Sequence, residues 1–175
     1  MAAVLIRDAL PAELDQVGEI RVSAYVADGF MSPSSQYAPR LRTLGADGIG
    51  DVLVAVTGEA SAEPRLIGTV MLRYWPDGGE FLQEQGDAEI RALAVAPSAR
   101  GTGTGKALLQ AVIDRAASSG VRHLLLCTQP EMLAAHYLYE QAGFVRLPAK
   151  DRSPAPGVNL LAYGLWLDAD ERLIS

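Results

Sequence analysis

A glycine-rich stretch that could bind an anion lies near the middle of the chain, within residues 89–108. An apolar run ends at Val95, and the alternating glycines Gly101, Gly103 and Gly105 follow it before a helical pattern begins. A strand, a glycine loop and a helix N-terminus in this order direct several backbone N–H groups toward one point. The stretch therefore predicts a loop that holds a phosphate or pyrophosphate group.

Two familiar phosphate-binding patterns do not fit this loop. The Walker A pattern needs a glycine where Arg100 stands and a serine or threonine where Ala107 stands. The dinucleotide pattern G-x-G-x-x-G fails because Lys106 and Leu108 occupy the places of its third glycine. The loop fits R-x-x-G-x-G over residues 100–105. A glycine-rich turn without a ligand is the alternative interpretation.

On these residues the chain resembles the GNAT superfamily of N-acyltransferases, which use acetyl-CoA. The resemblance implies an α/β fold of the GNAT type, with a mixed and largely antiparallel central sheet flanked by helices. It also implies acetyl-CoA as cosubstrate, no metal, pyrophosphate held by the loop amides, and a preceding strand paired by its backbone with the pantetheine arm. In that strand, a backbone N–H near Leu93 would polarise the thioester carbonyl. The cofactor-binding residues implied in this way are Leu93, Ala94, Val95, Arg100, Gly101, Thr102, Gly103, Thr104, Gly105 and Lys106.

A second match to the family lies at residues 135–144, which look like its A-x-x-L-Y-x-x-x-G-F signature. In the family the tyrosine commonly lies near the CoA sulfur and protonates the leaving thiolate, which implies a catalytic role for Tyr139. An aromatic side chain packed in the core is the other interpretation of Tyr139. Met132 stands where many members carry an asparagine that contacts the cofactor, so that contact is not carried over.

Glu89 is the candidate general base, because an attacking amine must be neutral and a group must accept its proton. It begins the central strand, where some family members, including histone acetyltransferases, place a glutamate base. Strand alternation predicts that Glu89 and Arg91 share a face with Leu93 and Val95. A surface carboxylate paired with Arg91 is the alternative. Cys127 is expected to be a small buried residue rather than a nucleophile.

Hydrophobic periodicity predicts the elements that position these residues. Strands are expected at Val4–Ile6, Asp51–Thr57, Leu66–Arg73, Glu89–Val95, Arg122–Thr128, Phe144–Leu147 and Val158–Leu167. Helices are expected at Pro11–Ala27, at Tyr37–Leu44, from the glycine loop to Gly120, and from Pro130 to Gly143. Residues 75–86 are expected to form a polar connection, residues 151–156 to interrupt the last strands, and the tail from Asp168 to fray. Residues 1–175 are expected to form a single domain.

Composition limits the class of protein. The chain has 175 residues, 49% of them hydrophobic, a net charge of −6 and a single cysteine, Cys127. The acidic balance disfavours nucleic-acid binding, and the single cysteine permits no internal disulfide, which favours the cytoplasm. The absence of a signal-peptide pattern and of a long apolar run predicts a soluble protein without membrane attachment.

The sequence thus predicts a cytoplasmic N-acetyltransferase that moves an acetyl group from acetyl-CoA to a primary amine by direct attack in a ternary complex. The acceptor would be an amine-bearing small molecule or peptide, and no motif identifies it. A catalytically silent acyl-CoA-binding sensor or scaffold is the alternative. Oligomeric state is left open, although dimers are common in the family.

Overall fold

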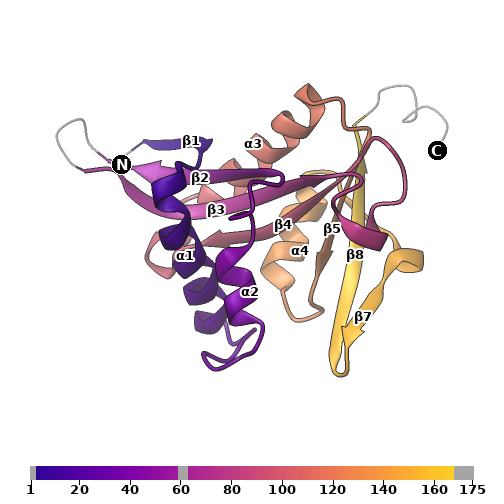
Figure 1. Cartoon of the computed structure of the whole chain (residues 1–175), viewed down its shortest axis with the longest axis horizontal. Helices are drawn as coiled ribbons and strands as arrows, with labels where there is room; N and C mark the ends of the chain where they lie inside the picture. Colours follow the sequence, from indigo (N-terminus) through magenta and orange to yellow (C-terminus); the bar gives the residue numbers. More distant parts are fainter. Residues whose placement is uncertain (1–2, 59–62, 168–175) are drawn as a thin grey trace. The chain divides into compact units, whose positions relative to one another are not determined.

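The computed structural model describes residues 3–58 and 63–167, which form a mixed α/β structure (Figure 1). Its strands, in chain order, are β1 (Val4–Asp8), β2 (Asp51–Thr57), β3 (Arg65–Tyr74), β4 (Asp87–Val95), β5 (His123–Thr128), β6 (Val145–Arg146), β7 (Arg152–Ala155) and β8 (Val158–Trp166). Its helices are α1 (Leu14–Ala27), α2 (Ala38–Thr43), α3 (Thr104–Ser118) and α4 (Leu133–Gln141). Short 3₁₀ turns lie at Pro11–Glu13, Gly79–Phe81, Pro97–Ala99 and Pro148–Lys150.

Hydrogen bonds between the strands give the order β1-β2-β3-β4-β5-β8-β6, with β7 paired to β8. The pairs β1–β2, β5–β8, β6–β8 and β7–β8 are antiparallel, whereas β4 and β5 are parallel. A parallel pair needs a long crossover, which α3 supplies between β4 and β5. The predicted mixed and largely antiparallel sheet with flanking helices is confirmed.

The chain packs as two compact units, which we describe separately. Unit 1 comprises Met1–Met71 and Ala92–Val112, and unit 2 comprises Leu72–Arg91 and Ile113–Ser175. Each boundary falls inside an element, because β3, β4 and α3 contribute residues to both units. The single domain expected from the sequence stays a prediction.

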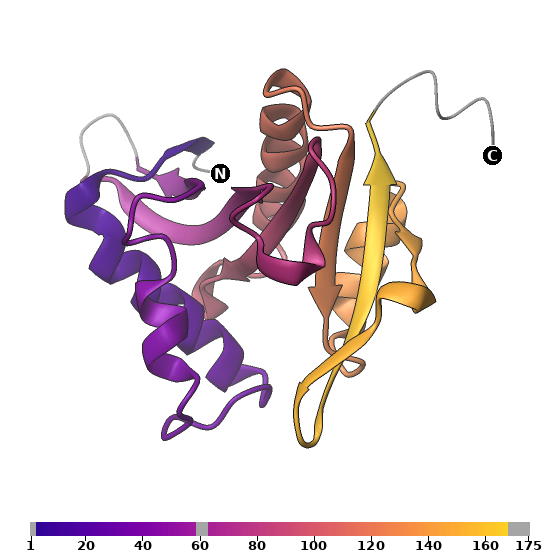
Figure 2. The same cartoon turned by 45° about the vertical axis from the view of Figure 1, so that its right-hand side comes forward.

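In unit 1, the apolar face of α1 packs against β2 and α2. Val17 lies against Val54 and Val56, and Val22 lies against Ala38 and Leu41 of α2. The two helices lie side by side in Figures 1 and 2. The absence of a side chain at Gly18 permits this approach, since a Cβ built there would lie 2.4 Å from the carbonyl oxygen of Arg42.

Arg21 fixes the end of α2 from within unit 1. Its fully buried guanidinium donates hydrogen bonds to the carbonyl oxygens of Leu41 (3.2 Å) and Leu44 (2.6 Å). The last carbonyl oxygens of a helix receive no hydrogen bond from within the helix. A buried cation at this end supplies the missing donors and complements the helix dipole. The segment after α1 is thereby held against α1.

In unit 2, β8 runs beside β5, as the yellow and orange ribbons show in Figure 2. Strand β7 directly precedes β8 and forms a hairpin with it. The core around β5 contains Leu125 and Ala162 together with Phe81 and Leu82. Phe81 and Leu82 belong to the connection that the sequence analysis expected to be polar. That expectation was wrong for these two side chains, which are only 5% and 4% exposed.

The end of the chain differs from expectation at residues 151–156. These residues were expected to interrupt the last strands, but Arg152–Ala155 form β7 and pair with β8. A proline is tolerated in such an edge strand because its missing N–H costs no ladder bond, and Pro154 lies in β7. The predicted fray from Asp168 lies outside the described residues.

The other elements follow the predictions closely, with small shifts at helix ends. The first turn of the Pro11–Ala27 helix is a 3₁₀ turn, and α4 begins at Leu133 rather than at Pro130. Gly120 and Gly143 end their helices with φ of 79° and 99°, the left-handed conformation that glycine accepts without strain.

Replacing Gly18 with alanine should destabilise the protein even though alanine favours a helix by about 1 kcal/mol. The new Cβ would overlap the Arg42 backbone, and overpacking of this kind costs about 1–3 kcal/mol. Urea unfolding of Gly18→Ala would measure the difference. Gln16→Ala, at an exposed position of α1, is the control, and an increase in stability for Gly18→Ala would contradict the proposed close packing.

Candidate functional site

The glycine loop joins β4 to α3 in unit 1, as the sequence predicts. A 3₁₀ turn at Pro97–Ala99 leads into it, and Gly101 and Gly103 have φ of 73° and 81°. A Cβ added at either glycine would meet no atom within 4 Å. Packing therefore does not demand glycine at these two positions, whereas the left-handed backbone does.

From the sequence, the helix was expected to begin after Gly105. Helix α3 begins at Thr104 instead, so Gly105 lies inside its first turn. The N–H of Ala107 donates to the carbonyl of Gly103 at 3.0 Å. The N–H groups of Thr104, Gly105 and Lys106 precede this bond and therefore have no acceptor within the helix. The loop thus ends in a helix N-terminus with its positive dipole end.

Two threonine side chains brace the loop from inside. The Thr102 hydroxyl donates to the carbonyl of Ala99 at 2.6 Å and lies 2.8 Å from the Thr104 hydroxyl. Because Thr102 has a single hydroxyl proton, the Thr104 hydroxyl must donate in the second contact. Thr104 is 2% exposed. Both side chains serve the loop's own structure, which leaves its backbone as the surface for a ligand.

Arg100 uses its side chain on α1 in the same unit. Its guanidinium donates to the Asp28 carboxylate and, at 3.2 Å, to the carbonyl of Ala24. The basic residue that begins the R-x-x-G-x-G pattern therefore ties the loop to the C-terminal end of α1.

Gly68 is a positioning residue that the sequence analysis missed. A Cβ at this point in β3 would lie 2.8 Å from Leu108 Cδ1, 3.1 Å from the Ala94 carbonyl oxygen and 3.3 Å from Thr104 Cγ2. Gly68 thus lets the first turns of α3 approach the sheet. The available signal was a glycine inside an otherwise apolar strand, which often marks a close approach.

Strand β4 changes conformation at Ala92, which has φ of 52°. The parallel register of β4 with β5 runs from Asp87↔His123 to Ile90↔Leu126 and ends there. A residue in the left-handed region interrupts the pleat. The predicted alternation that places Glu89 and Arg91 on one face with Leu93 and Val95 is therefore wrong across Ala92.

Beyond Ala92, residues 93–95 lie in unit 1. Leu93 and Val95 are half-buried, and Ala94 packs against Ile20 and Ala24 of α1. The side chain of Ala94 is thus committed to the core of unit 1.

In unit 2, Glu89 is 4% exposed. Burial raises the pKa of its carboxyl, and the positive charges of Arg91, Arg152 and Arg73 oppose that rise. The Arg152 Nη2 atom lies 3.9 Å from Glu89 Oε1. The interpretation of Glu89 as an exposed surface carboxylate is therefore wrong.

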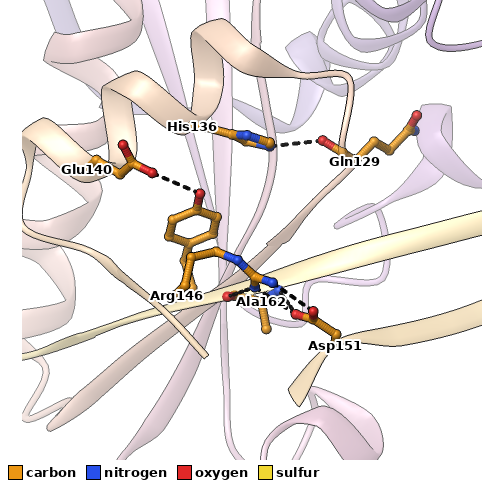
Figure 3. Close-up of polar contacts among 7 residues, drawn as sticks. Gln129, His136, Glu140, Arg146, Asp151 and Ala162 are labelled. Carbon is orange, nitrogen blue, oxygen red and sulfur yellow. Dashed lines mark hydrogen bonds and ion pairs between the residues drawn. The ribbon is translucent and has the colours of Figure 1, made fainter. Parts of the chain in front are cut away.

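Tyr139 is the buried residue of α4, with 7% exposure. Its ring lies 5.9 Å from that of Phe144 and 6.2 Å from that of Tyr163, measured between centroids. The Tyr163 hydroxyl donates to Glu140 Oε1 at 3.1 Å, and a ring nitrogen of His136 lies 2.9 Å from the Gln129 carbonyl oxygen (Figure 3). Tyr139 thus lies in an aromatic cluster whose neighbours have polar partners.

Cys127 does not have the properties of a nucleophile. Burial raises the pKa of its thiol to about 11, so the thiol stays protonated near neutral pH. Across residues 3–58 and 63–167, no three His, Cys, Asp or Glu side chains gather as metal ligands. Over the same ranges, the helices are too short or too polar to cross a membrane.

A model of the acetyltransferase (GNAT) family matches residues 17–144. The chain belongs to this family. The match covers the glycine loop, Glu89 and Tyr139, and the family is one of acetyltransferases.

Individual proteins that resemble this GNAT chain have low sequence identity to it. It is 34% identical over 82 residues to the mycothiol acetyltransferase of Geodermatophilus obscurus. The aligned stretch covers 47% of this chain and 26% of that protein. A GNAT-family acetyltransferase from Staphylococcus aureus Mu50 has a TM-score of 0.72 at 18% identity, over 95% of this chain and 100% of its own. The acetyltransferase yncA from Salmonella typhimurium, whose structure holds acetyl-CoA, has a TM-score of 0.65 at 23% identity, over 95% of each chain. The structural matches confirm the GNAT fold.

Proposed function

We propose that this protein transfers an acetyl group from acetyl-CoA to a primary amine of a small molecule or peptide, by direct attack in a ternary complex. The observation that carries the proposal is the open backbone of Gly101 and Gly103 at the N-terminus of α3, in a chain of the GNAT family. Acetyl-CoA supplies the thioester-bound acetyl group. The single cysteine, which permits no internal disulfide, supports a cytoplasmic location.

The loop residues Arg100–Lys106 fit the pyrophosphate of CoA through their backbone. The left-handed glycines leave space for close approach, and the N–H groups at the start of α3 can donate to an anion. The exposed Lys106 adds a positive charge. Arg100 contributes its backbone, because its side chain is bound to α1.

The backbone of residues 93–95 fits the pantetheine arm. These residues belong to β4, whose parallel register with β5 ends at Ile90. On the side where β5 no longer pairs with it, the strand backbone can offer N–H and C=O groups to the amides of an extended ligand.

Substituting Gly103 with alanine should weaken CoA binding by about tenfold, because a Cβ in the left-handed region costs about 1–2 kcal/mol and fills the space of the ligand. Calorimetry with CoA measures the affinity. Gly120→Ala is a matched control, since Gly120 has φ of 79° and equally open surroundings at the other end of α3. Equal affinity for CoA in both variants would count against the loop as the pyrophosphate site.

We assign Tyr139 the role of general acid that protonates the departing thiolate. Removal of the hydroxyl in Tyr139→Phe keeps the ring and its packing with Phe144. Turnover should fall by about 10²–10⁴-fold, as is typical for loss of general acid catalysis, while CoA affinity stays close to that of the wild type. Steady-state kinetics combined with calorimetry would separate the two quantities, and unchanged turnover across the pH range would remove Tyr139 from the mechanism.

We assign Glu89 the role of general base toward the acceptor amine. Burial raises the pKa of this carboxyl, which strengthens it as a proton acceptor near neutral pH. Since the base must be ionised, kcat/KM should fall as pH drops through that pKa, at a pH above the ordinary value of about 4.3. In Glu89→Gln we expect turnover to fall by about 10²-fold or more. We also expect kcat/KM to lose this fall at low pH, the acidic limb of the pH profile. An acidic limb that persists in Glu89→Gln would assign it to another group.

A catalytically silent CoA-binding module predicts a different result. CoA would bind in calorimetry, but no thiol would be released from acetyl-CoA with any member of a panel of primary amines. Release of CoA thiol with formation of the acetylated amine supports the transferase.

A further inference from the structure

Arg152 is a cation of unit 2 that has no role in the acetyl transfer proposed for Tyr139 and Glu89. Its Nη2 atom lies 3.9 Å from Glu89 Oε1, and its Cζ atom lies 4.7 Å from the centroid of the Phe81 ring. The Arg152 side chain is 40% exposed, whereas that of Glu89 is 5% exposed. The guanidinium carbon therefore lies over a buried aromatic ring, and the group reaches both the candidate base and solvent.

The backbone beside Arg152 is held by an ion pair. Arg146 donates to both Asp151 oxygens at 2.7 Å and to the carbonyl of Ala162 at 2.7 Å (Figure 3). Asp151 in turn accepts the N–H of Ala162 at 2.8 Å. The hydrogen bonds from Arg146 and from this N–H lower the pKa of Asp151 to about 2. The start of β7 is thus fixed to β8, which limits where Arg152 can place its side chain.

Positive charge exceeds negative charge around Glu89. Arg73, Arg91 and Arg152 all favour its ionised form, and Lys150 Nζ lies 6.0 Å from the Phe81 centroid. The chain as a whole carries −6. This local concentration of arginine in an acidic protein favours a ligand that carries a negative charge.

Glu89 does not use the hydrogen-bonding capacity of Arg152. At 3.9 Å the contact is an ion pair beyond the 2.7–3.2 Å range of a hydrogen bond. A guanidinium has five N–H donors in a planar fork that matches a carboxylate. The position of the guanidinium over the Phe81 ring adds cation–π attraction.

We propose that Arg152 binds a carboxylate of the acetyl acceptor, so that the acceptor is an amino acid or another amine that carries a carboxylate. The proposal rests on the proposed transferase function. Arg152 binds the carboxylate while the adjacent Glu89 accepts the proton of the amine. The distance between the two groups suits a small molecule in which amine and carboxylate are close neighbours.

Matched acceptor pairs test this assignment. Each pair joins an amino acid to the amine that lacks its carboxylate: phenylalanine with phenethylamine, leucine with isoamylamine, and methionine with 3-(methylthio)propylamine. The wild-type kcat/KM should favour the amino acid by about tenfold or more, since a hydrogen-bonded charge pair contributes about 1.5–3 kcal/mol. Equal values within all three pairs would overturn the proposal and leave the transferase function intact.

Variants of Arg152 identify the residue responsible. In Arg152→Gln we expect KM for the amino acids to rise about 10–100-fold more than KM for the plain amines. Arg152→Lys, which keeps the charge but not the fork, should lie between the two. Arg65→Gln, at an exposed position of β3, controls for net charge. An equal loss for both members of each pair would show that Arg152 acts only through structure or through Glu89.

Binding gives a readout that does not depend on turnover. Calorimetry with CoA-saturated protein should detect the amino acid of each pair more tightly than its amine, and Arg152→Gln should abolish the difference. If CoA binds but no amine is acetylated, the proposed transferase function fails. The difference in affinity between each amino acid and its amine still decides the role of Arg152, and equal affinities would overturn the assignment of Arg152 to a carboxylate.

Discussion

The left-handed backbone of Ala92 is the constraint on which the arrangement of β4 depends. A non-glycine residue in this conformation costs about 1–3 kcal/mol and persists only where the surroundings impose it. Here the Ala92 side chain packs against Val22, Ala38 and Leu41 of α1 and α2. Those helices are themselves held together by Gly18 and Arg21. The packing of the first half of the chain thus stabilises the break in the strand.

The break separates two kinds of environment along one strand. Before it, β4 is paired with β5, and Glu89 is buried among arginines. After it, the strand leads through residues 93–95 to the glycine loop in unit 1. The register of Ile90 with Leu126 would place Ala92 opposite Thr128, the last residue of β5, so residues 93–95 extend beyond the end of β5.

The elements with strong local signals could be predicted from the sequence, and those fixed by tertiary contacts could not. The β-branched run of β2 and the glycine caps at Gly120 and Gly143 appear where the sequence places them. The conformation of Ala92 has no local signal, because alanine does not favour it and only packing selects it. Strand β7 was missed because pairing with β8 outweighs the turn propensity of its serine and proline.

The candidate site divides along the same line. A backbone that binds phosphate needs left-handed residues and a helix N-terminus, and glycine spacing reports both directly. The surroundings of Glu89 are built from side chains on separate elements, including Arg152 on β7 and Phe81 in a 3₁₀ turn. No spacing in the sequence links these residues, because the sheet and the Arg146–Asp151 pair bring them together.

The glycine loop and the hairpin that carries Arg152 belong to different units of the chain. The loop is braced by Thr102, Thr104 and Arg100, all within unit 1. The hairpin that carries Arg152 belongs to unit 2, where Asp151 accepts hydrogen bonds from Arg146 and from the N–H of Ala162. A substitution of Arg152 would alter the charge presented beside Glu89, whereas the contacts of Arg100, Thr102 and Thr104 that brace the loop lie within unit 1. The glycine pattern reports only the second set of contacts, so it can identify a family without identifying an acceptor.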